Sequence, residues 1–377
     1  MDSLNITVVA GSLGGGGAER IVLWLAEQLT RVGHKLTILT LHDDGTDFYD
    51  VPMAVRRVKA PEVVSKSYRW FDWRGQLRSS NQLRSLILGT APDIVVTFID
   101  SINVRVLQAL GNNSLPVIVS EQTDWRFHKI SWRWRIFRRL YYPRAKGVVV
   151  LSSDLYHFGL NRRPSWNLVH IANPVPKINV PAIAKPKWFG SKTIIAMGRL
   201  VPEKGFDLLL KAFKLIASTH KDWKLVILGE GAERKTLLHL ADNLELNDRV
   251  TMPGAYRCPF GLLQLADVFV FSSRYEGFGL ALAEAMAVGL PVITFNCPSG
   301  PADIVRDDVD GLLVPPGDVP ALAVAMDKLI SDPELRQRLA RRAPDVCERF
   351  APELIRDQWI KLIEEAVALK KNGVELS

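Results

Sequence analysis

The feature that most constrains the fold of this chain is an alternation of strand and helix patterns. In the first half, short runs rich in β-branched residues lie at 6–10, 36–41, 94–98, 117–120 and 148–151. Their apolar residues are mostly continuous rather than alternating, as expected for parallel strands covered on both faces. A helical pattern at 19–31 separates the first two runs. This βαβ arrangement predicts a doubly wound α/β sheet.

The alternation restarts after a proline-rich segment at 173–186. Further strand patterns lie at 193–197, 224–228, 250–252, 268–271 and 292–295, with helical patterns at 207–218 and 320–330. A chain of 377 residues is also too long for one ordinary core. We therefore predict two Rossmann-like, doubly wound parallel-sheet domains at 1–175 and 176–351. A long amphipathic helix follows from Pro352.

Composition argues against several other classes. No run reaches the ~20 uncharged apolar residues of a membrane-spanning helix, and the first residues lack the basic region of a signal peptide. The three cysteines, Cys258, Cys297 and Cys347, are widely spaced. They fit a reducing cytosol and argue against a disulfide framework or a zinc site.

The positive charge is concentrated in the first half. Residues 1–175 contain 22 Lys/Arg and 14 Asp/Glu, a difference of +8, whereas the rest contains 26 of each. Such an excess predicts an anionic partner for the first half.

One basic segment also contains many aromatic residues. Residues 125–146 hold eight Lys/Arg and no acid. If the segment is helical, an apolar stripe forms from Trp132, Ile136, Phe137 and Leu140, with Arg135, Arg138 and Arg139 largely off it. This pattern suits an anionic bilayer surface, where each cation is worth about 1 kcal/mol, and residues 66–84 have a similar composition. Alternatively, the stripe packs on the sheet with solvated arginines. Single-stranded nucleic acid is a weaker alternative because no nucleic-acid fold signature is present.

Glycine-containing turns follow several strands. Four consecutive glycines occupy 14–17, where they let the backbone approach a ligand beside a helix N-terminus. Neither the G-x-G-x-x-G nor the P-loop pattern fits this loop. In the turn at 197–205, Arg199 and Lys204 can converge on a diphosphate.

A third turn precedes the apolar helical pattern at 280–288. Glu276 lies in the turn, where its carboxylate can accept hydrogen bonds from sugar hydroxyls. Glu284 lies within the apolar pattern, so its burial requires a partner. Ribose hydroxyls would serve, as would neighbouring backbone groups or an arginine.

In this order, the motifs resemble those of the retaining glycosyltransferases with the two-domain GT-B fold. That group includes bacterial polysaccharide and polyprenyl-linked glycan transferases. The matching segments cover nearly the whole chain and lie at 14–20, 198–205, 229–231, 276–284 (an E-x7-E pair) and 310–315.

The resemblance implies a donor site facing a cleft between the domains, with a terminal helix that crosses back to the first. Arg199 and Lys204 would bind the donor diphosphate and take up the charge of the departing nucleotide, while Glu276 would hold the transferred sugar. The implied catalytic residues are therefore Arg199, Lys204 and Glu276. The implied donor-binding residues are Gly15, Gly16, Gly198, Arg199, Lys204, Glu230, Phe278, Gly279, Leu280 and Glu284.

The acceptor side departs from the family pattern. Gln122 stands where many relatives have a histidine near the reacting sugar, and Glu121 either caps the strand end or contacts a substrate. The residues expected to contact the acceptor or a membrane are Glu121, Gln122, Trp132, Arg135, Arg138 and Arg139.

No metal or separate cofactor is expected, since the nucleotide-sugar is a substrate and the one D-x-D, at 308–310, runs into a turn. Cations and helix termini can take the leaving-group charge instead. We expect a hexose or N-acetylhexosamine to pass from a UDP-sugar to a polyprenyl-diphosphate-linked glycan, at the cytoplasmic face of the inner membrane. The alternatives are a soluble transferase for a small sugar or sugar phosphate, a non-catalytic scaffold that binds nucleotide-sugar, and, less favoured, a nucleotide-sugar epimerase.

Overall fold

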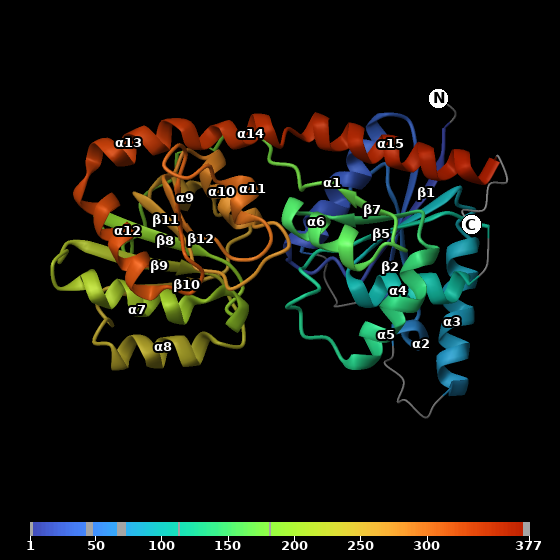
Figure 1. Ribbon diagram of the computed structural model, residues 1–377, viewed down its shortest axis with the longest axis horizontal. Coiled ribbons are helices and arrows are strands. Elements are labelled where there is room, and N and C mark those ends of the chain that lie inside the picture. The colour runs from blue at the N-terminus through green and yellow to red at the C-terminus, as the bar shows by residue number, and fades with distance from the viewer. Residues whose placement is uncertain (1–2, 43–47, 66–72, 112–113, 181, 372–377) are drawn as a thin grey trace. The chain divides into compact units, whose positions relative to one another are not determined.

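The chain forms two compact α/β units. The computed structural model describes residues 3–42, 48–65, 73–111, 114–180 and 182–371. Unit 1 contains the described residues up to Leu151, with 155–172 and those from Glu353 onward, and unit 2 contains 152–154 and 173–352. Each unit has a parallel sheet with helices on both sides (Figure 1), which confirms the predicted fold class.

In the described residues, unit 1 has a seven-stranded sheet in the order β3-β2-β1-β4-β5-β6-β7. Its strands are β1 (Asn5–Ala10), β2 (Lys35–Thr40), β3 (Arg56–Lys59), β4 (Ile94–Phe98), β5 (Val117–Ser120), β6 (Gly147–Val150) and β7 (Leu168–His170). All neighbouring strands pair in parallel. The strand order changes direction between β1 and β4, where open parallel sheets bind their ligands.

The helices of unit 1 cover the two faces of this sheet. They are α1 (Gly17–Arg31), α2 (Glu62–Ser65), α3 (Trp73–Leu88), α4 (Asp100–Leu110), α5 (Trp132–Tyr141), α6 (Ser153–Arg162) and the C-terminal α15 (Pro352–Lys371). Trp359 of α15 is 2% exposed, and its ring lies 6.0 Å from that of Phe98 on β4. The amphipathic pattern predicted from Pro352 is therefore used to cover the first sheet.

Unit 2 repeats the plan with a six-stranded sheet, in its described residues, in the order β10-β9-β8-β11-β12-β13. Its strands are β8 (Lys192–Met197), β9 (Trp223–Leu228), β10 (Val250–Gly254), β11 (Val268–Phe271), β12 (Val292–Phe295) and β13 (Leu312–Val314). Here the order changes direction between β8 and β11.

The described helices of unit 2 differ in how they begin, and a side chain caps the N-terminus of two of them. The helices are α7 (Phe206–Ala217), α8 (Arg234–Asn243), α9 (Phe260–Gln264), α10 (Leu280–Ala287), α11 (Pro301–Ile304), α12 (Val319–Ser331), α13 (Pro333–Arg342) and α14 (Val346–Arg349). Asp318 and Asp332 cap α12 and α13 by accepting hydrogen bonds from the N–H groups of Ala321 and Leu335. Leu209, which is fully buried, is among the α7 residues that bury one helix face.

The sequence patterns missed three strands, all at sheet edges. β3 consists of Arg-Arg-Val-Lys, and β7 and β13 have three residues each. Edge strands are often short or carry charged side chains, and both properties weaken their sequence pattern.

Among the described residues, no helix is both long enough and apolar enough to cross a membrane.

Candidate functional site

In unit 2 the predicted donor-binding residues lie at the carboxyl ends of neighbouring strands. Arg199 follows β8, Glu230 follows β9, and Glu276 lies in the loop after β11. Because β8 and β11 flank the point where the strand order changes direction, this edge is the expected ligand-binding position. The fold thus brings Arg199, Lys204 and Glu276 to one edge of one sheet.

Two glycines allow the loops at this edge to pack closely. Gly205 has a φ of 62°, and a Cβ atom there would lie 2.0 Å from the carbonyl oxygen of Ser272. A Cβ atom on Gly229 would lie 1.9 Å from the carbonyl oxygen of Gly198. Only glycine is compatible with such approaches, so these two positions determine how the loops meet.

Lys204 and Glu276 form an ion pair at this edge. Lys204 Nζ lies 2.5 Å from Glu276 Oε1, which also accepts a hydrogen bond from Ser273 Oγ at 2.6 Å. The Lys204 and Glu276 side chains are 20% and 10% exposed. A charge shielded from water in this way interacts more strongly with a bound ion than an exposed one does.

Arg199 adds a second positive charge on the neighbouring loop, and it is exposed. Burial and the nearby Glu203 carboxylate raise the pKa of Tyr275 to about 12, and the charge of Arg199 acts in the opposite direction. Arg199 therefore lies close enough to the loop after β11 to act on it electrostatically.

Helix α10 begins directly after that loop. Its N-cap residue is Gly279, with a φ of 109°, and no side chain among the described residues caps it. Phe278 is 2% exposed and fixes the turn through an edge contact with Phe350. The N–H groups of the first turn of a helix carry partial positive charge. Leu280 begins the helix, and Glu284 is buried in it.

Glu230 occupies a more open position after β9. Its side chain is 54% exposed and pairs with Arg234 at 3.0 Å. Arg234 also donates a hydrogen bond to the Met252 carbonyl oxygen at 2.6 Å. Through Arg234, the end of β9 is connected to β10. These contacts do not by themselves indicate ligand binding.

In unit 1 the glycine loop joins β1 to α1. The N–H of Gly16 donates a hydrogen bond to the Gly14 carbonyl oxygen at 2.7 Å, and Gly16 is the N-cap residue of α1. A Cβ atom on Gly15 would lie 3.0 Å from the Phe48 ring. Gly15 and Gly16 thus lie at the point where the order of the first sheet changes direction.

Glu121 belongs to a buried polar cluster after β5 rather than to an exposed strand cap. It is 1% exposed, and its Oε1 accepts a hydrogen bond from the Tyr142 hydroxyl. Arg138 Nη1 lies 3.7 Å from the same oxygen. Burial raises the pKa of Glu121 to about 7, although the charge of Arg138 acts in the opposite direction. Tyr142 in turn accepts a hydrogen bond from Asn103 Nδ2 at 3.1 Å.

Asp100 and His128 extend this cluster, and the sequence interpretation missed both. Asp100 Oδ2 lies 3.2 Å from His128 Nδ1 and 4.0 Å from Arg138 Nη1. The hydrogen bond with Asp100 raises the pKa of His128 against the opposing effect of burial. Burial disfavours the charged form of Asp100, but hydrogen bonds from His128 and the Ser101 N–H outweigh it and lower the pKa of Asp100. Since Asp100 closely follows β4, its strand-end position is the signal that could have identified it.

The prediction of a cationic membrane face on α5 is wrong for Arg138. Arg138 is 6% exposed and points toward the two buried carboxylates. Trp132, Ile136 and Leu140, however, are exposed by 55%, 43% and 61%. The expected apolar stripe therefore lies largely on the surface rather than on the sheet, with only Phe137 half-buried against the core.

Arg135 and Arg139 are exposed on α5, as predicted. The second basic and aromatic segment spans residues 66–84. Residues 66–72 lie outside the described residues, and Arg78, on α3, is exposed.

The two remaining predicted features have local partners. Gln122 donates a hydrogen bond from Nε2 to Ser120 Oγ at 2.8 Å. In the D-x-D sequence, Asp308 pairs with Arg338, and Asp310 is fully buried and pairs with Arg306. Among the described residues, no group of three or more His, Cys, Asp or Glu side chains is arranged to hold a metal.

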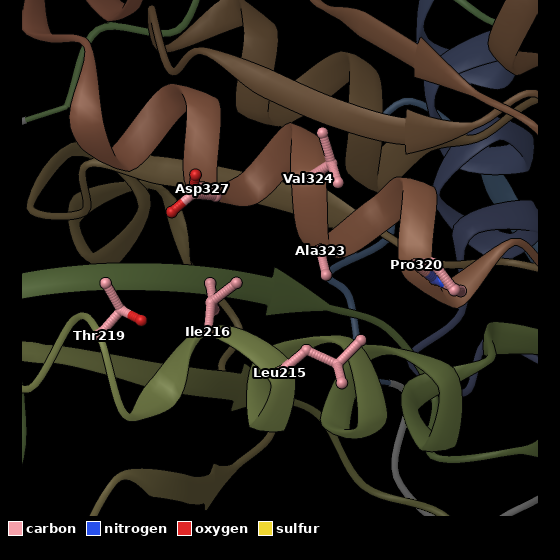
Figure 2. Close-up of a pocket in the computed structure, with 7 residues that line it drawn as sticks. All are labelled: Leu215, Ile216, Thr219, Pro320, Ala323, Val324 and Asp327. Atoms are coloured by element: carbon pink, nitrogen blue, oxygen red, sulfur yellow. The ribbon is translucent and has the colours of Figure 1, made fainter.

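A shallow groove of about 330 Å³ lies elsewhere on unit 2, between α7 and α12. Figure 2 shows its lining residues, which are Leu215, Ile216, Thr219, Pro320, Ala323, Val324 and Asp327. None of them belongs to the predicted sites, so the groove is separate from the strand-end loops.

Comparison with known families gives a match in each half of the chain. Residues 15–177 match the family described as Glycosyltransferase Family 4, and residues 183–346 match the one described as Glycosyl transferases group 1. The first match begins in the glycine loop after β1, and the second contains all the strand-end loops of unit 2.

Individual proteins are similar over almost the full length. An uncharacterized glycosyltransferase of Haemophilus influenzae is 26% identical over 348 residues, which are 91% of this chain and 95% of that protein. The Campylobacter jejuni protein named GalNAc-alpha-(1->4)-GalNAc-alpha-(1->3)-diNAcBac-PP-undecaprenol alpha-1,4-N-acetyl-D-galactosaminyltransferase is 26% identical over 367 residues, 96% of this chain and 99% of that protein. The structure of HepE from Anabaena in complex with UDP and glucose superposes with a TM-score of 0.80 at 20% identity, covering 96% of this chain and 99% of that one.

Proposed function

Because the chain belongs to the glycosyltransferases of the GT-B fold, we propose that it transfers a hexose or N-acetylhexosamine from a UDP-sugar to a polyprenyl-diphosphate-linked glycan, with retention of configuration at the anomeric carbon. The observation that carries the proposal is the set of Arg199, Lys204 and Glu276 at the point where the sheet order of unit 2 changes direction. The undecaprenol-linked substrate in the name of the Campylobacter jejuni relative supports the acceptor class. The UDP and glucose in the Anabaena complex support the donor class.

In this proposal unit 2 binds the donor. Arg199 and Lys204 hold the diphosphate, together with the N–H groups of Phe278, Gly279 and Leu280 at the start of α10. The Glu276 carboxylate accepts hydrogen bonds from hydroxyls of the transferred sugar, and Glu284 does so from the ribose. Lys204 and Glu276 are in contact already, so each side chain fixes the position of the other before the donor arrives.

The same cations account for the chemistry. As the bond from the anomeric carbon to the diphosphate oxygen breaks, negative charge develops on the leaving diphosphate, and Arg199 and Lys204 stabilise it. The acceptor oxygen bonds to the anomeric carbon on the face that the diphosphate leaves. Its proton passes to a diphosphate oxygen, so the step requires neither a protein base nor a metal ion.

We assign acceptor binding to unit 1, with Glu121 and Gln122 near the acceptor and Gly15 and Gly16 at the same edge of the sheet. Helix α5 supports a membrane-bound acceptor. Its exposed apolar residues, Trp132, Ile136 and Leu140, accompany the exposed Arg135 and Arg139 on one helix. Apolar side chains flanked by arginines suit peripheral binding to an anionic bilayer, where each cation contributes about 1 kcal/mol.

The test of donor chemistry is nucleotide release from UDP- and GDP-sugars, with EDTA, and with or without vesicles carrying a polyprenyl-diphosphate N-acetylhexosamine. Lys204→Gln should lower the release rate by about a hundredfold or more, because it removes a charge that stabilises the transition state. Lys211→Gln, on the exposed side of α7, should leave the rate unchanged. Equal rates in the two variants, or loss of activity with EDTA, would contradict the proposed mechanism.

The same vesicles test the membrane assignment. Trp132→Asp should reduce co-sedimentation with anionic vesicles, whereas Leu160→Asp, at an exposed site on α6, should not. Transfer that is independent of lipid, with no vesicle binding, would favour a soluble acceptor such as a sugar phosphate. A protein that binds UDP-sugar but releases no nucleotide would be a scaffold.

A further inference from the structure

The buried cluster of unit 1 lies at the edge of the sheet where a ligand is expected. Phe98 at the end of β4 pairs with Ser120 at the end of β5, so Asp100 and Glu121 follow adjacent strand ends. β4 also pairs with β1, which leads into the glycine loop. The two carboxylates and the glycine loop therefore share one edge of the sheet, at the position where open parallel sheets bind ligands.

His128 is the ionisable member of this cluster that reaches the surface. Its side chain is 34% exposed, whereas that of Asp100 is 6% exposed. Nδ1 faces Asp100, and among the described residues Nε2 has no hydrogen-bond partner. An ionised Asp100 accepts a hydrogen bond from Nδ1–H, which leaves the lone pair of the neutral imidazole on Nε2. His128 thus presents a hydrogen-bond acceptor of fixed orientation.

Two buried oxygen atoms of the same cluster point independently to a polar ligand. Glu121 Oε2 and Asn103 Oδ1 are buried and have no hydrogen-bond partner in the part of the chain that the structure describes. Their residues are 1% and 0% exposed. Asn103 and Glu121 both hydrogen-bond with Tyr142 in this cluster. Since buried polar atoms are nearly always hydrogen-bonded, their two unpartnered oxygens indicate capacity for a hydroxyl-bearing ligand. Arg138 lies between the two carboxylates and holds them in place.

Resting on the function proposed above, we propose that His128 binds the acceptor, with Nε2 accepting a hydrogen bond from the acceptor hydroxyl that becomes glycosylated. Asp100 is a positioning residue that fixes the tautomer and orientation of the ring. Arg138 lies 4.0 Å from Asp100 and 3.7 Å from Glu121, and its charge positions Asp100. The proton of the hydroxyl still passes to the leaving diphosphate, so His128 orients the nucleophile and undergoes no net change in protonation.

This role makes a specific prediction for pH. Protonation of Nε2 removes the hydrogen-bond acceptor, so kcat/KM for the acceptor should fall as the pH falls through the pKa of His128. Three charged groups face the ring, namely Asp100 on α4, Glu121 after β5 and Arg138 on α5. The hydrogen bond with Asp100 raises the pKa of His128 above its usual 6.5. The fall of acceptor kcat/KM on the acidic side of the pH profile, called the acidic limb below, should therefore have its midpoint above pH 6.5.

The experiment compares His128→Gln with His157→Gln, which changes an exposed histidine on α6. Loss of one strong hydrogen bond should lower kcat/KM for the acceptor by about tenfold to a hundredfold in His128→Gln only. The acidic limb should flatten, and donor hydrolysis without acceptor should be unchanged. Glu121→Gln should keep the limb but move it to lower pH, because the Glu121 carboxylate helps raise the pKa of His128. An unchanged acceptor kcat/KM and pH profile in His128→Gln would overturn the proposal.

A binding measurement separates this inference from the proposed function. The Cε1–H resonance of His128 is identified by its absence from the NMR spectrum of His128→Gln. We expect it to shift on titration with a water-soluble farnesyl-diphosphate N-acetylhexosamine, while that of His157 does not. An unmoved resonance would overturn the role of His128 even if the wild-type protein transfers sugar. A failure of the wild-type protein to transfer sugar would instead count against the proposed function.

Discussion

Replacing Glu121 with glutamine would remove a buried titrating group from unit 1 while keeping the size of the side chain. Burial raises the pKa of Glu121 from its usual 4.5 to about 7 in the folded protein. Between these values the folded protein holds a proton that the unfolded chain has released. The free energy of unfolding therefore falls as the pH rises, by about 1.4 kcal/mol per pH unit. Over the whole interval Glu121 costs about 3 kcal/mol, and this cost is fully present above pH 7.

Glu121→Gln lacks this titration, and its amide oxygen can still accept the hydrogen bond from Tyr142. The difference in unfolding free energy, variant minus wild type, should therefore increase by about 3 kcal/mol from pH 4.5 to pH 8. Groups that the substitution leaves unperturbed contribute equally to the pH dependence of both proteins, so their contributions cancel in this difference. Hydrogen–deuterium exchange of peptides from β5 and β6, corrected for intrinsic exchange at each pH, reports the stability of unit 1 separately from unit 2.

Glu365→Gln, at an exposed position on α15, serves as the control and should show a difference that is flat with pH. A flat difference for Glu121→Gln as well would refute the reasoning. It would mean that Arg138 keeps Glu121 ionised throughout this range, so that the charge of Arg138, not burial, sets the protonation state of the cluster.

Two further substitutions test the fold around the sites. Gly205→Ala should destabilise unit 2 by about 1–3 kcal/mol and weaken UDP binding, because its Cβ atom would collide with Ser272. Gly317→Ala, with a φ of 73° and open space around it, should incur only the backbone strain and leave UDP binding unchanged in calorimetry. Trp359→Ala should destabilise unit 1 by about 3–5 kcal/mol, measured by the same hydrogen exchange, because it leaves a cavity against β4; a loss below 1 kcal/mol would show that α15 contributes little to the core.

The sequence alone determined the central strands and the loops that follow them. A buried parallel strand leaves a continuous apolar run, and a glycine-containing turn before a helix marks the end of such a strand. Arg199, Lys204 and Glu276 could therefore be named in advance, because each lies close to such a strand end in the chain. Whether they bind the donor remains a prediction.

The tertiary structure alone decided which residues form the buried polar cluster of unit 1. The rotation of α5 about its axis turns Arg138 inward while Trp132 faces outward, and a basic segment without acids gives no local sign of this choice. The contact between Asp100 and His128 joins α4 to a loop 28 residues further along the chain. Such contacts depend on the register of neighbouring strands and on how the helices pack against them, and both are set by the fold as a whole rather than by any local pattern.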